Sequence, residues 1–196
     1  MMQIALFGTS ADPPTAGHQA ILTWLSQHFD QVICWASDNP FKSHQTNLET
    51  RTEMLRVLIE EIPTSNSGAT SNISLHPELG HRYTIETVKA ARNYWPKAEF
   101  TLVIGSDLVG QITQWYKIEE LLRNVDLLIV PRPGYEMNIE DLTRLQELGG
   151  GVAIASIIGL PVSSTDYREA GNIDALTSPV QDYIQRQGLY QSSLKE

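Results

Sequence analysis

Six short apolar runs rich in β-branched residues alternate along the chain with segments of helical spacing. Each run has the length of one strand, and the runs are residues 3–7, 31–36, 73–76, 100–104, 127–130 and 152–157. The intervening segments place apolar residues three and four positions apart, as at Met54, Leu55, Leu58 and Ile59, which is the spacing of one helix face. Parallel strands need long crossover connections, so this order predicts repeated β-α-β units. We therefore expect an α/β fold built on a single doubly wound, mostly parallel sheet of five or six strands.

The length of 196 residues is that of one ordinary domain. The clearest break is the polar, turn-forming stretch 63–71, which is too short to separate domains. We expect residues 1–196 to form a single domain. After Ser178 and Pro179, a good helix start, Val180 and Ile184 have helical spacing, so a short C-terminal helical segment should close the chain.

The charge balance limits the partners of this chain. With 14 Lys+Arg against 23 Asp+Glu the net charge is −9, which argues against a broad surface for nucleic acid or an anionic membrane. The single cysteine, Cys34, lies in an apolar run and cannot form an internal disulfide. The N-terminus has no signal-peptide pattern, and no apolar run approaches the ~18 residues that span a bilayer. We expect a cytoplasmic protein; a homo-oligomer stays open.

The first apolar run leads into the loop 8–18, GTSADPPTAGH, and then into a helical pattern. In open α/β sheets this is the place where ligands bind, and exposed amides with the helix dipole favour an anion there. The loop matches neither the Walker pattern nor GxGxxG. It places Thr15 and His18 three residues apart around Gly17, which would leave room for a phosphate. The alternative, a plain turn followed by a surface histidine, is equally compatible with the spacing alone.

A second anion-binding pattern follows the sixth run. Ser163, Ser164 and Thr165 precede a short helical segment that contains Arg168. Hydroxyls and amides at a helix start, with a guanidinium one turn later, suit a phosphate chain. Taken alone, the same residues are more often a simple N-cap.

The two patterns together, TxGH after the first strand and SSTxxR near the C-terminus, resemble the signatures of the nucleotidyltransferase superfamily with the HxGH or TxGH motif. Interior stretches narrow the resemblance to the nicotinate/nicotinamide mononucleotide adenylyltransferase family, and the matches cover almost the whole chain. These stretches are NPFKSH, RTEM, HRYTIETV, LVIGSDLVGQITQWYKIEELL and IVPRPGY. The IGSD…W…RPG arrangement is the most specific of them. The resemblance implies a Rossmann-like nucleotidyltransferase fold.

Five positions depart from the family pattern. Thr9 and Ala11 replace a glycine and an aromatic residue in the first loop, and Thr15 replaces the more common first histidine. Arg82 stands where a small polar residue is usual, and Tyr167 where an aliphatic one is. His18, Thr165 and Arg168 are retained, so these changes bear on substrate preference more than on reaction type.

The resemblance implies transfer of the AMP moiety of ATP to the 5′-phosphate of nicotinate mononucleotide, with nicotinamide mononucleotide as a further candidate acceptor. It assigns catalysis to His18, Thr15 and Arg168. ATP would be bound by Gly8, Thr9, Ser10, His18, Gly105, Asp107, Ser163, Ser164, Thr165 and Arg168. The mononucleotide would meet Lys42, Tyr83, Thr84 and Trp115. Mg²⁺ would bind through the ATP phosphates, and the histidines show no zinc spacing.

Three of these assigned residues also have a plainer structural interpretation. Lys42 suits a solvated surface lysine, Asp107 an N-cap, and Trp115 a core residue. Two other functions also stay open: a transferase of the same superfamily that acts on another phosphorylated substrate such as phosphopantetheine, and a nucleotide-binding regulator without turnover.

Overall fold

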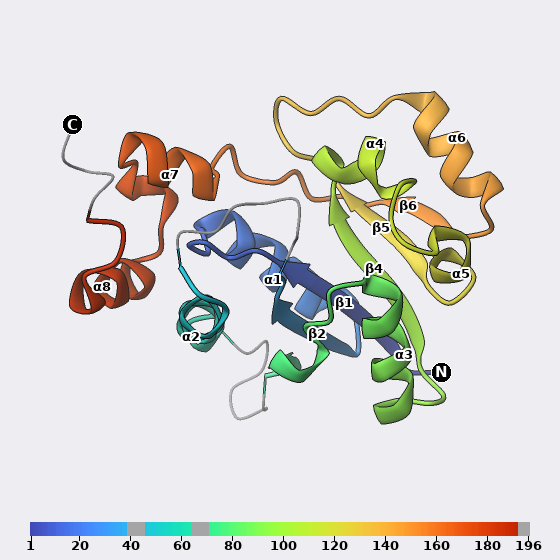
Figure 1. Ribbon diagram of the computed structural model, residues 1–196, viewed down its shortest axis with the longest axis horizontal. Coiled ribbons are helices and arrows are strands. Elements are labelled where there is room, and N and C mark those ends of the chain that lie inside the picture. Colours follow the sequence, from blue (N-terminus) through green and yellow to red (C-terminus); the bar gives the residue numbers. More distant parts are fainter. Residues whose placement is uncertain (39–45, 64–70, 192–196) are drawn as a thin grey trace.

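The computed structural model in Figure 1 describes residues 1–38, 46–63 and 71–191 and contains one six-stranded parallel sheet in the order β3-β2-β1-β4-β5-β6. Every strand pair is parallel. The strands are β1 Gln3–Thr9, β2 Gln31–Ala36, β3 Ile73–Leu75, β4 Glu99–Gly105, β5 Asp126–Val130 and β6 Val152–Ile154. The expected doubly wound α/β sheet is therefore confirmed.

Helices cover both faces of the sheet. The α-helices are α1 Ala16–His28, α2 Leu48–Glu60, α3 Thr84–Tyr94, α4 Val109–Ile112, α5 Ile118–Leu122, α6 Ile139–Glu147, α7 Ser164–Ala170 and α8 Ser178–Gln187. Three short 3-10 helices, η1 Pro77–Leu79, η2 Ser106–Leu108 and η3 Ile173–Ala175, complete the described elements. Buried side chains of α1, α2, α7 and α8 pack on one face, and those of α3, α4, α5 and α6 on the other. Among the described residues no helix has both the length and the apolarity to cross a membrane.

Side chains of each strand alternate between the two faces. In β1, Ala5 and Phe7 join the core under α1 and α2, while Ile4 and Leu6 join the core under α3 to α6. This alternation explains why the strands read as unbroken apolar runs, since a parallel sheet buries both of its faces. Strand β1 lies at the centre, where the strand order changes direction. The carboxyl ends of β1 and β4 thus form the crevice in which such sheets bind ligands.

The sixth strand is shorter than the expected run 152–157. It ends at Ile154, although the Ala155 N–H still donates to the Ile129 carbonyl at 2.8 Å. The next donor of the ladder would be the nitrogen of Pro131, which carries no hydrogen. The chain therefore leaves the sheet and runs toward α7.

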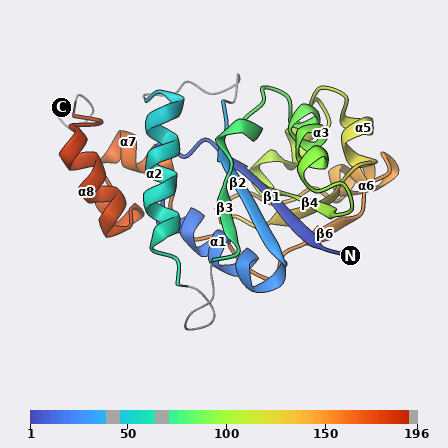
Figure 2. The ribbon, with the colours of Figure 1, turned by 90° about the horizontal axis from the view of Figure 1, so that it is seen from below.

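The C-terminal helix is confirmed as α8, Ser178–Gln187. It packs against α2, so that α2, α7 and α8 gather at one end of the molecule and α5 and α6 lie at the other (Figures 1 and 2). Most of the polar break 63–71 lies outside the described residues.

Candidate active site

The loop after β1 ends in a hydrogen-bonded pair of side chains at the start of α1. Thr15 is the N-cap residue, and its backbone N–H donates to Nδ1 of His18 at 3.0 Å. The Thr15 hydroxyl lies 2.8 Å from the same nitrogen. Because a backbone N–H can only donate, Nδ1 must accept, and the ring proton of neutral His18 is placed on Nε2. The pair thus presents an N–H donor at the positive end of a 13-residue helix.

The SSTxxR segment contacts this loop directly. The Ser164 hydroxyl donates to the Pro13 carbonyl at 2.8 Å, and Arg168 Nη1 donates to the Asp12 carbonyl at 2.5 Å. Arg168 Nη2 also lies 3.2 Å from the Thr165 hydroxyl oxygen. The two sequence patterns, more than 140 residues apart in the chain, therefore form one constellation.

Ser163 has the plainer of its two expected roles. It is the N-cap of α7, and its hydroxyl oxygen accepts from the Asp166 N–H at 3.0 Å.

Two glycines of the first loop are explained by packing. A Cβ at Gly8 would lie 2.6 Å from the Trp35 ring. A Cβ at Gly17 would lie 3.3 Å from the Val162 side chain. In the direction of a Cβ at Gly17, the segment before α7 fills the space; the expected approach of a phosphate to the backbone there stays a prediction.

Asp107 follows β4, in η2, and pairs with a residue of the next strand's loop. Its Oδ2 lies 3.1 Å from Nη1 of Arg132, and both side chains are partly buried. The N-cap of η2 is Gly105 and that of α4 is Leu108. The N-cap interpretation of Asp107 is thus wrong. A Cβ at Gly105 would clash with the Asp107 carboxylate. The absence of a side chain at Gly105 therefore allows this carboxylate to lie over the end of β4.

The residues expected around the pyridine ring lie near the starts of α3 and α5. Tyr83 is the N-cap of α3 and Thr84 its first residue. The rings of Tyr83 and Tyr116 have centroids 4.5 Å apart, and both side chains are exposed. Trp115 is only partly buried and packs on the core under α3 to α6, so it combines a core contact with some accessible surface.

Lys42 and His44 lie outside the described residues. Of two further histidines without zinc spacing in the sequence, His76 pairs through Nδ1 with Glu78 at 2.7 Å, and His81 is exposed. Within residues 1–38, 46–63 and 71–191 no group of three or more His, Cys, Asp and Glu side chains could hold a metal ion.

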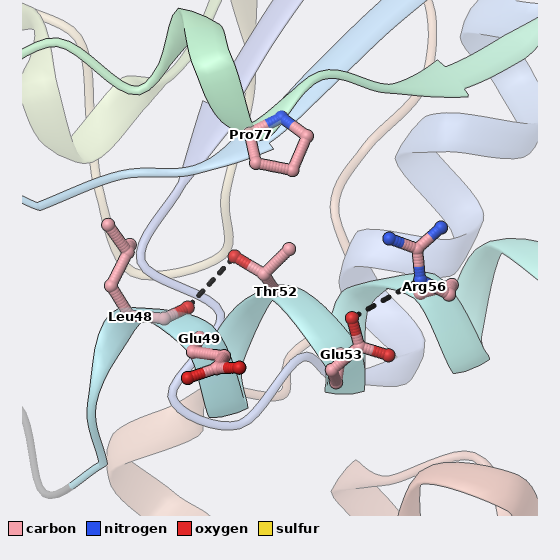
Figure 3. Close-up of a pocket in the computed structure, with 6 residues that line it drawn as sticks. All are labelled: Leu48, Glu49, Thr52, Glu53, Arg56 and Pro77. Carbon is pink, nitrogen blue, oxygen red and sulfur yellow. Dashed lines mark hydrogen bonds and ion pairs between the residues drawn. The ribbon is translucent and has the colours of Figure 1, made fainter.

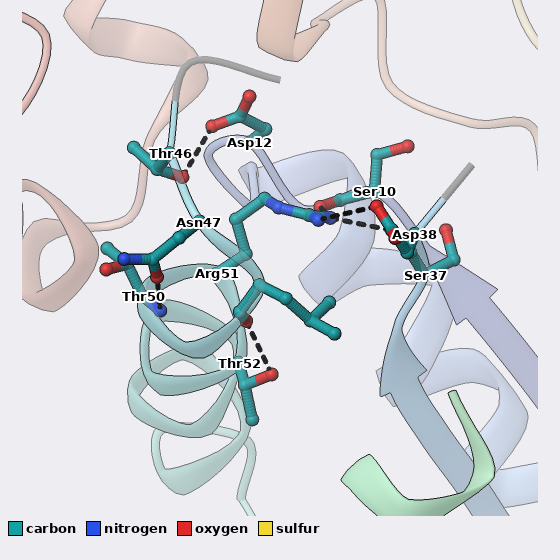
Figure 4. A network of polar contacts seen from close by, with 10 residues as sticks. Ser10, Asp12, Ser37, Asp38, Thr46, Asn47, Thr50, Arg51 and Thr52 are labelled. Carbon is teal, nitrogen blue, oxygen red and sulfur yellow. Dashed lines mark hydrogen bonds and ion pairs between the residues drawn. The ribbon is translucent and has the colours of Figure 1, made fainter. Parts of the chain in front are cut away.

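Three polar residues close to the loop were not assigned from the sequence: Arg51, Asp12 and Tyr190. Arg51 in α2 is 1% exposed, and its Nη1 donates to the carbonyls of Ser10 at 2.8 Å and Ser37 at 2.6 Å (Figure 4). It thereby joins the chain segments that leave β1 and β2. Burial lowers the pKa of Arg51, opposed by the charges of Asp12 and Asp38.

The carboxylate of Asp12 is also buried, at 2% exposure. Its Oδ1 accepts from the hydroxyl of Thr46 at 2.8 Å and from that of Tyr190 at 2.6 Å. Arg51 lies in the RTEM stretch and Asp12 in the loop 8–18, so both belong to segments with a recognisable sequence pattern. Tyr190 belongs to no pattern.

A separate depression of about 440 Å³ lies between α2 and η1. It is lined by Leu48, Glu49, Thr52, Glu53, Arg56 and Pro77 (Figure 3). It contains none of the residues expected in the site, and two of its lining side chains are carboxylates, which repel phosphates. The candidate site is therefore the crevice at β1 and β4.

Comparisons with known proteins identify the family of this chain. Residues 6–170 match the Cytidylyltransferase-like family model. A probable nicotinate-nucleotide adenylyltransferase of Synechocystis sp. is 43% identical, covering 96% of this chain and 99% of the relative. The nicotinate-nucleotide adenylyltransferase of Bacillus subtilis is 27% identical, covering 98% and 100%.

A solved structure shows the same fold. The Plasmodium falciparum nicotinic acid mononucleotide adenylyltransferase complexed with NaAD superposes with a TM-score of 0.80 over 100% of both chains, at 21% identity. Together with the relatives, this shows that the chain belongs to the nicotinate-nucleotide adenylyltransferase family, within the cytidylyltransferase-like proteins.

Proposed function

We propose that this protein transfers the AMP moiety of ATP to the 5′-phosphate of nicotinate mononucleotide, giving nicotinate adenine dinucleotide and pyrophosphate for NAD biosynthesis. The observation that carries the proposal is the contact between the TxGH loop and the SSTxxR helix at the carboxyl end of β1. The names of the relatives point to the same reaction.

The reaction needs no protein nucleophile. The acceptor is already an anionic phosphate at neutral pH, and it attacks the α-phosphorus of ATP while pyrophosphate leaves. The protein must align two like-charged reactants and neutralise charge on the leaving group. His18 suits the α-phosphate, because its Nδ1 is held by Thr15 and Nε2 is the donor that can stabilise developing charge.

Arg168, Ser164 and Thr165 suit the β- and γ-phosphates. Two donor atoms of the Arg168 guanidinium hold Asp12 and Thr165, out of five N–H groups in all. The planar fork can therefore keep its place while it donates to a phosphate oxygen. Gly8 and Thr9, which end β1, and Ser10, which follows it, would border the same phosphates.

The mononucleotide would occupy the neighbouring end of β4. Trp115 and Tyr83 offer aromatic surface for the pyridine ring, and Thr84 begins α3, whose positive end favours a nicotinate carboxylate. Asp107, close to Gly105 at the same end of β4, would accept from the ribose hydroxyls of ATP. We assign the mononucleotide phosphate to Lys42 on the sequence alone.

Magnesium would enter with ATP. The described residues offer no cluster of three or more metal-ligating side chains, which fits an ion that keeps its waters and takes its ligands from the phosphates. The ion would neutralise charge on the leaving pyrophosphate.

We further propose that residues 1–196 act as one domain in the cytoplasm, with small-molecule substrates and no nucleic-acid partner. The buried, unpaired thiol of Cys34 and the net charge of −9 support this reading. Self-association is left to a sizing measurement.

The test is pyrophosphate release with ATP and Mg²⁺, with nicotinate and nicotinamide mononucleotides compared at matched concentrations. We expect pyrophosphate release with nicotinate mononucleotide and a lower kcat/KM for the amide. Only the acid carries a carboxylate that the positive end of α3 can attract. Release with phosphopantetheine alone would reassign the substrate. ATP binding by calorimetry without any product would reduce the protein to a nucleotide binder.

A further inference from the structure

A tyrosine from the C-terminal end of the chain reaches the nucleotide loop. Tyr190 follows α8, is 7% exposed, and donates its hydroxyl to Asp12 Oδ1 at 2.6 Å across 178 residues of sequence. Burial and the neighbouring Asp12 raise the pKa of Tyr190, opposed by Thr46 and by the charge of Arg168. The hydroxyl therefore keeps its proton and acts as a donor throughout the neutral range.

Asp12 links this tyrosine to the proposed phosphate-binding arginine. Its side chain accepts from Tyr190 and Thr46, while its backbone carbonyl accepts from Arg168 at 2.5 Å. The carboxylate and the carbonyl belong to the same residue. Asp12 directly follows Ala11, whose φ is 49°. A shift of the Asp12 backbone, which the hydrogen bonds to its carboxylate oppose, would therefore move the acceptor of Arg168.

The ring of Tyr190 also contacts α7, the helix that contains Arg168. It meets the ring of Tyr167 edge to face, with centroids 5.6 Å apart and planes at 90°. Tyr167 is buried and directly precedes Arg168 in α7. One side chain thus contacts both the loop that receives Arg168 and the helix that carries it.

We propose that Tyr190 is a positioning residue for adenylyl transfer: its hydroxyl orients Asp12, and the Asp12 carbonyl then holds Arg168 in the direction of the ATP triphosphate. The proposal rests on the proposed function for the identity of the triphosphate ligand. A purely structural tyrosine would support the C-terminus without affecting how Arg168 meets the nucleotide.

The first variant is Tyr190→Phe, which keeps the ring and removes the hydroxyl. A hydrogen bond to a charged group contributes on the order of tenfold or more in an equilibrium, so we expect kcat/KM for MgATP to fall about tenfold. KM for nicotinate mononucleotide should stay within about twofold. The matched control is Tyr183→Phe, the same change on α8, which should leave both parameters unaltered.

A second background separates positioning from general support. In Arg168→Lys protein, which lacks the guanidinium, Tyr190→Phe should cost no more than about a further twofold in kcat/KM for MgATP. The same tenfold loss in both backgrounds would overturn the proposal, as would an unchanged kcat/KM in the single variant.

Thr46→Val gives an independent check if Tyr190→Phe unfolds, which thermal unfolding would reveal. It removes the other hydroxyl from Asp12 Oδ1 and should show the same selective loss toward MgATP; no loss would contradict the proposal. The dissociation constant of ATP with Mg²⁺, measured by calorimetry, needs no turnover. If wild type binds ATP without releasing pyrophosphate, the proposed function fails, while weaker ATP binding by Tyr190→Phe still supports the positioning role.

Discussion

At the scale of single residues, His18 serves two purposes with its two ring nitrogens. Nδ1 accepts from the Thr15 N–H and so caps α1, much as a glutamate or glutamine does at this helix position. The cap sets the orientation of the ring, and the other nitrogen becomes the donor. The stability of a helix and the stabilisation of a transition state thus depend on one side chain.

This division predicts how substitutions of His18 differ. His18→Ala should lower kcat by about two orders of magnitude or more with a modest change in KM, because the interaction forms mainly in the transition state. It should also cost about 1 kcal/mol in the free energy of unfolding through the lost cap. His18→Gln can retain the cap and should lose kcat at near wild-type stability. Steady-state kinetics and denaturant unfolding check both; a raised KM at unchanged kcat would contradict the assigned role.

Cys34 predicts a loss of stability in alkali. Burial raises the pKa of its thiol from 9.0 to about 12, so the unfolded chain ionises first as the pH rises. The contribution of the protonated Cys34 thiol to the free energy of unfolding is complete below pH 9.0 and is lost as the pH rises toward about 12. At pH 10 the free energy of unfolding should have lost on the order of 1 kcal/mol from this group. Urea unfolding of wild type and Cys34→Val at pH 8 and 10 measures it, and equal losses in both proteins would refute it.

At the scale of elements, α7 depends on its N-cap residue and on its first residue. The helix has only seven residues and is followed by the C-cap residue Gly171, whose φ of 65° suits glycine. Such a short helix has little stability of its own, so the cap by Ser163 and the Ser164 contact with Pro13 set its place against the loop.

Removal of that cap should therefore affect both stability and nucleotide binding. Ser163→Ala is expected to lower the free energy of unfolding by about 1 kcal/mol and to raise KM for MgATP, since the start of α7 frays. Ser163→Asn is the matched control, because asparagine caps equally well. Chemical unfolding and ATP-dependent kinetics decide the matter: equal behaviour of the two variants would show that the cap has no such role.

The elements also show what a sequence can reveal. Buried parallel strands produce apolar runs, and α1, α2 and α8 produce helical spacing, so the α/β fold was predictable. The end of β6 depends on Pro131, which directly follows β5, and the close contact at Gly17 depends on Val162, which is 145 residues further along the chain. Contacts of this kind leave no local pattern. The Asp107–Arg132 pair and the Asp12–Tyr190 bond escaped prediction for the same reason.

At the scale of the whole molecule, a protein of net charge −9 is proposed to bind two anionic substrates. Long-range attraction cannot bring them in. Affinity for the two substrates must come from hydrogen-bond donors within the crevice. Because these donors are in place only in the folded chain, substrate binding must stabilise the fold.

Nucleotide binding should raise the unfolding temperature accordingly. With MgATP at a hundred times its dissociation constant the fold should gain about 2.7 kcal/mol, which for a chain of this size corresponds to roughly 5–10 °C. Differential scanning calorimetry measures the shift. CTP at the same concentration should stabilise less, and Arg168→Lys should reduce the effect of ATP. An equal shift with CTP would argue against adenosine as the preferred nucleoside.

The bond between Asp12 and Tyr190 also bears on how the protein is made. The loop leaves the ribosome early, but its partner is 178 residues later, and chains emerge from the N-terminus. A nascent chain can pair β1 with β2, yet it cannot complete the hydrogen bonds of the nucleotide loop until Tyr190 has been synthesised. Premature termination within α8 would thus remove Tyr190 and leave Asp12 without the hydroxyl that this residue donates.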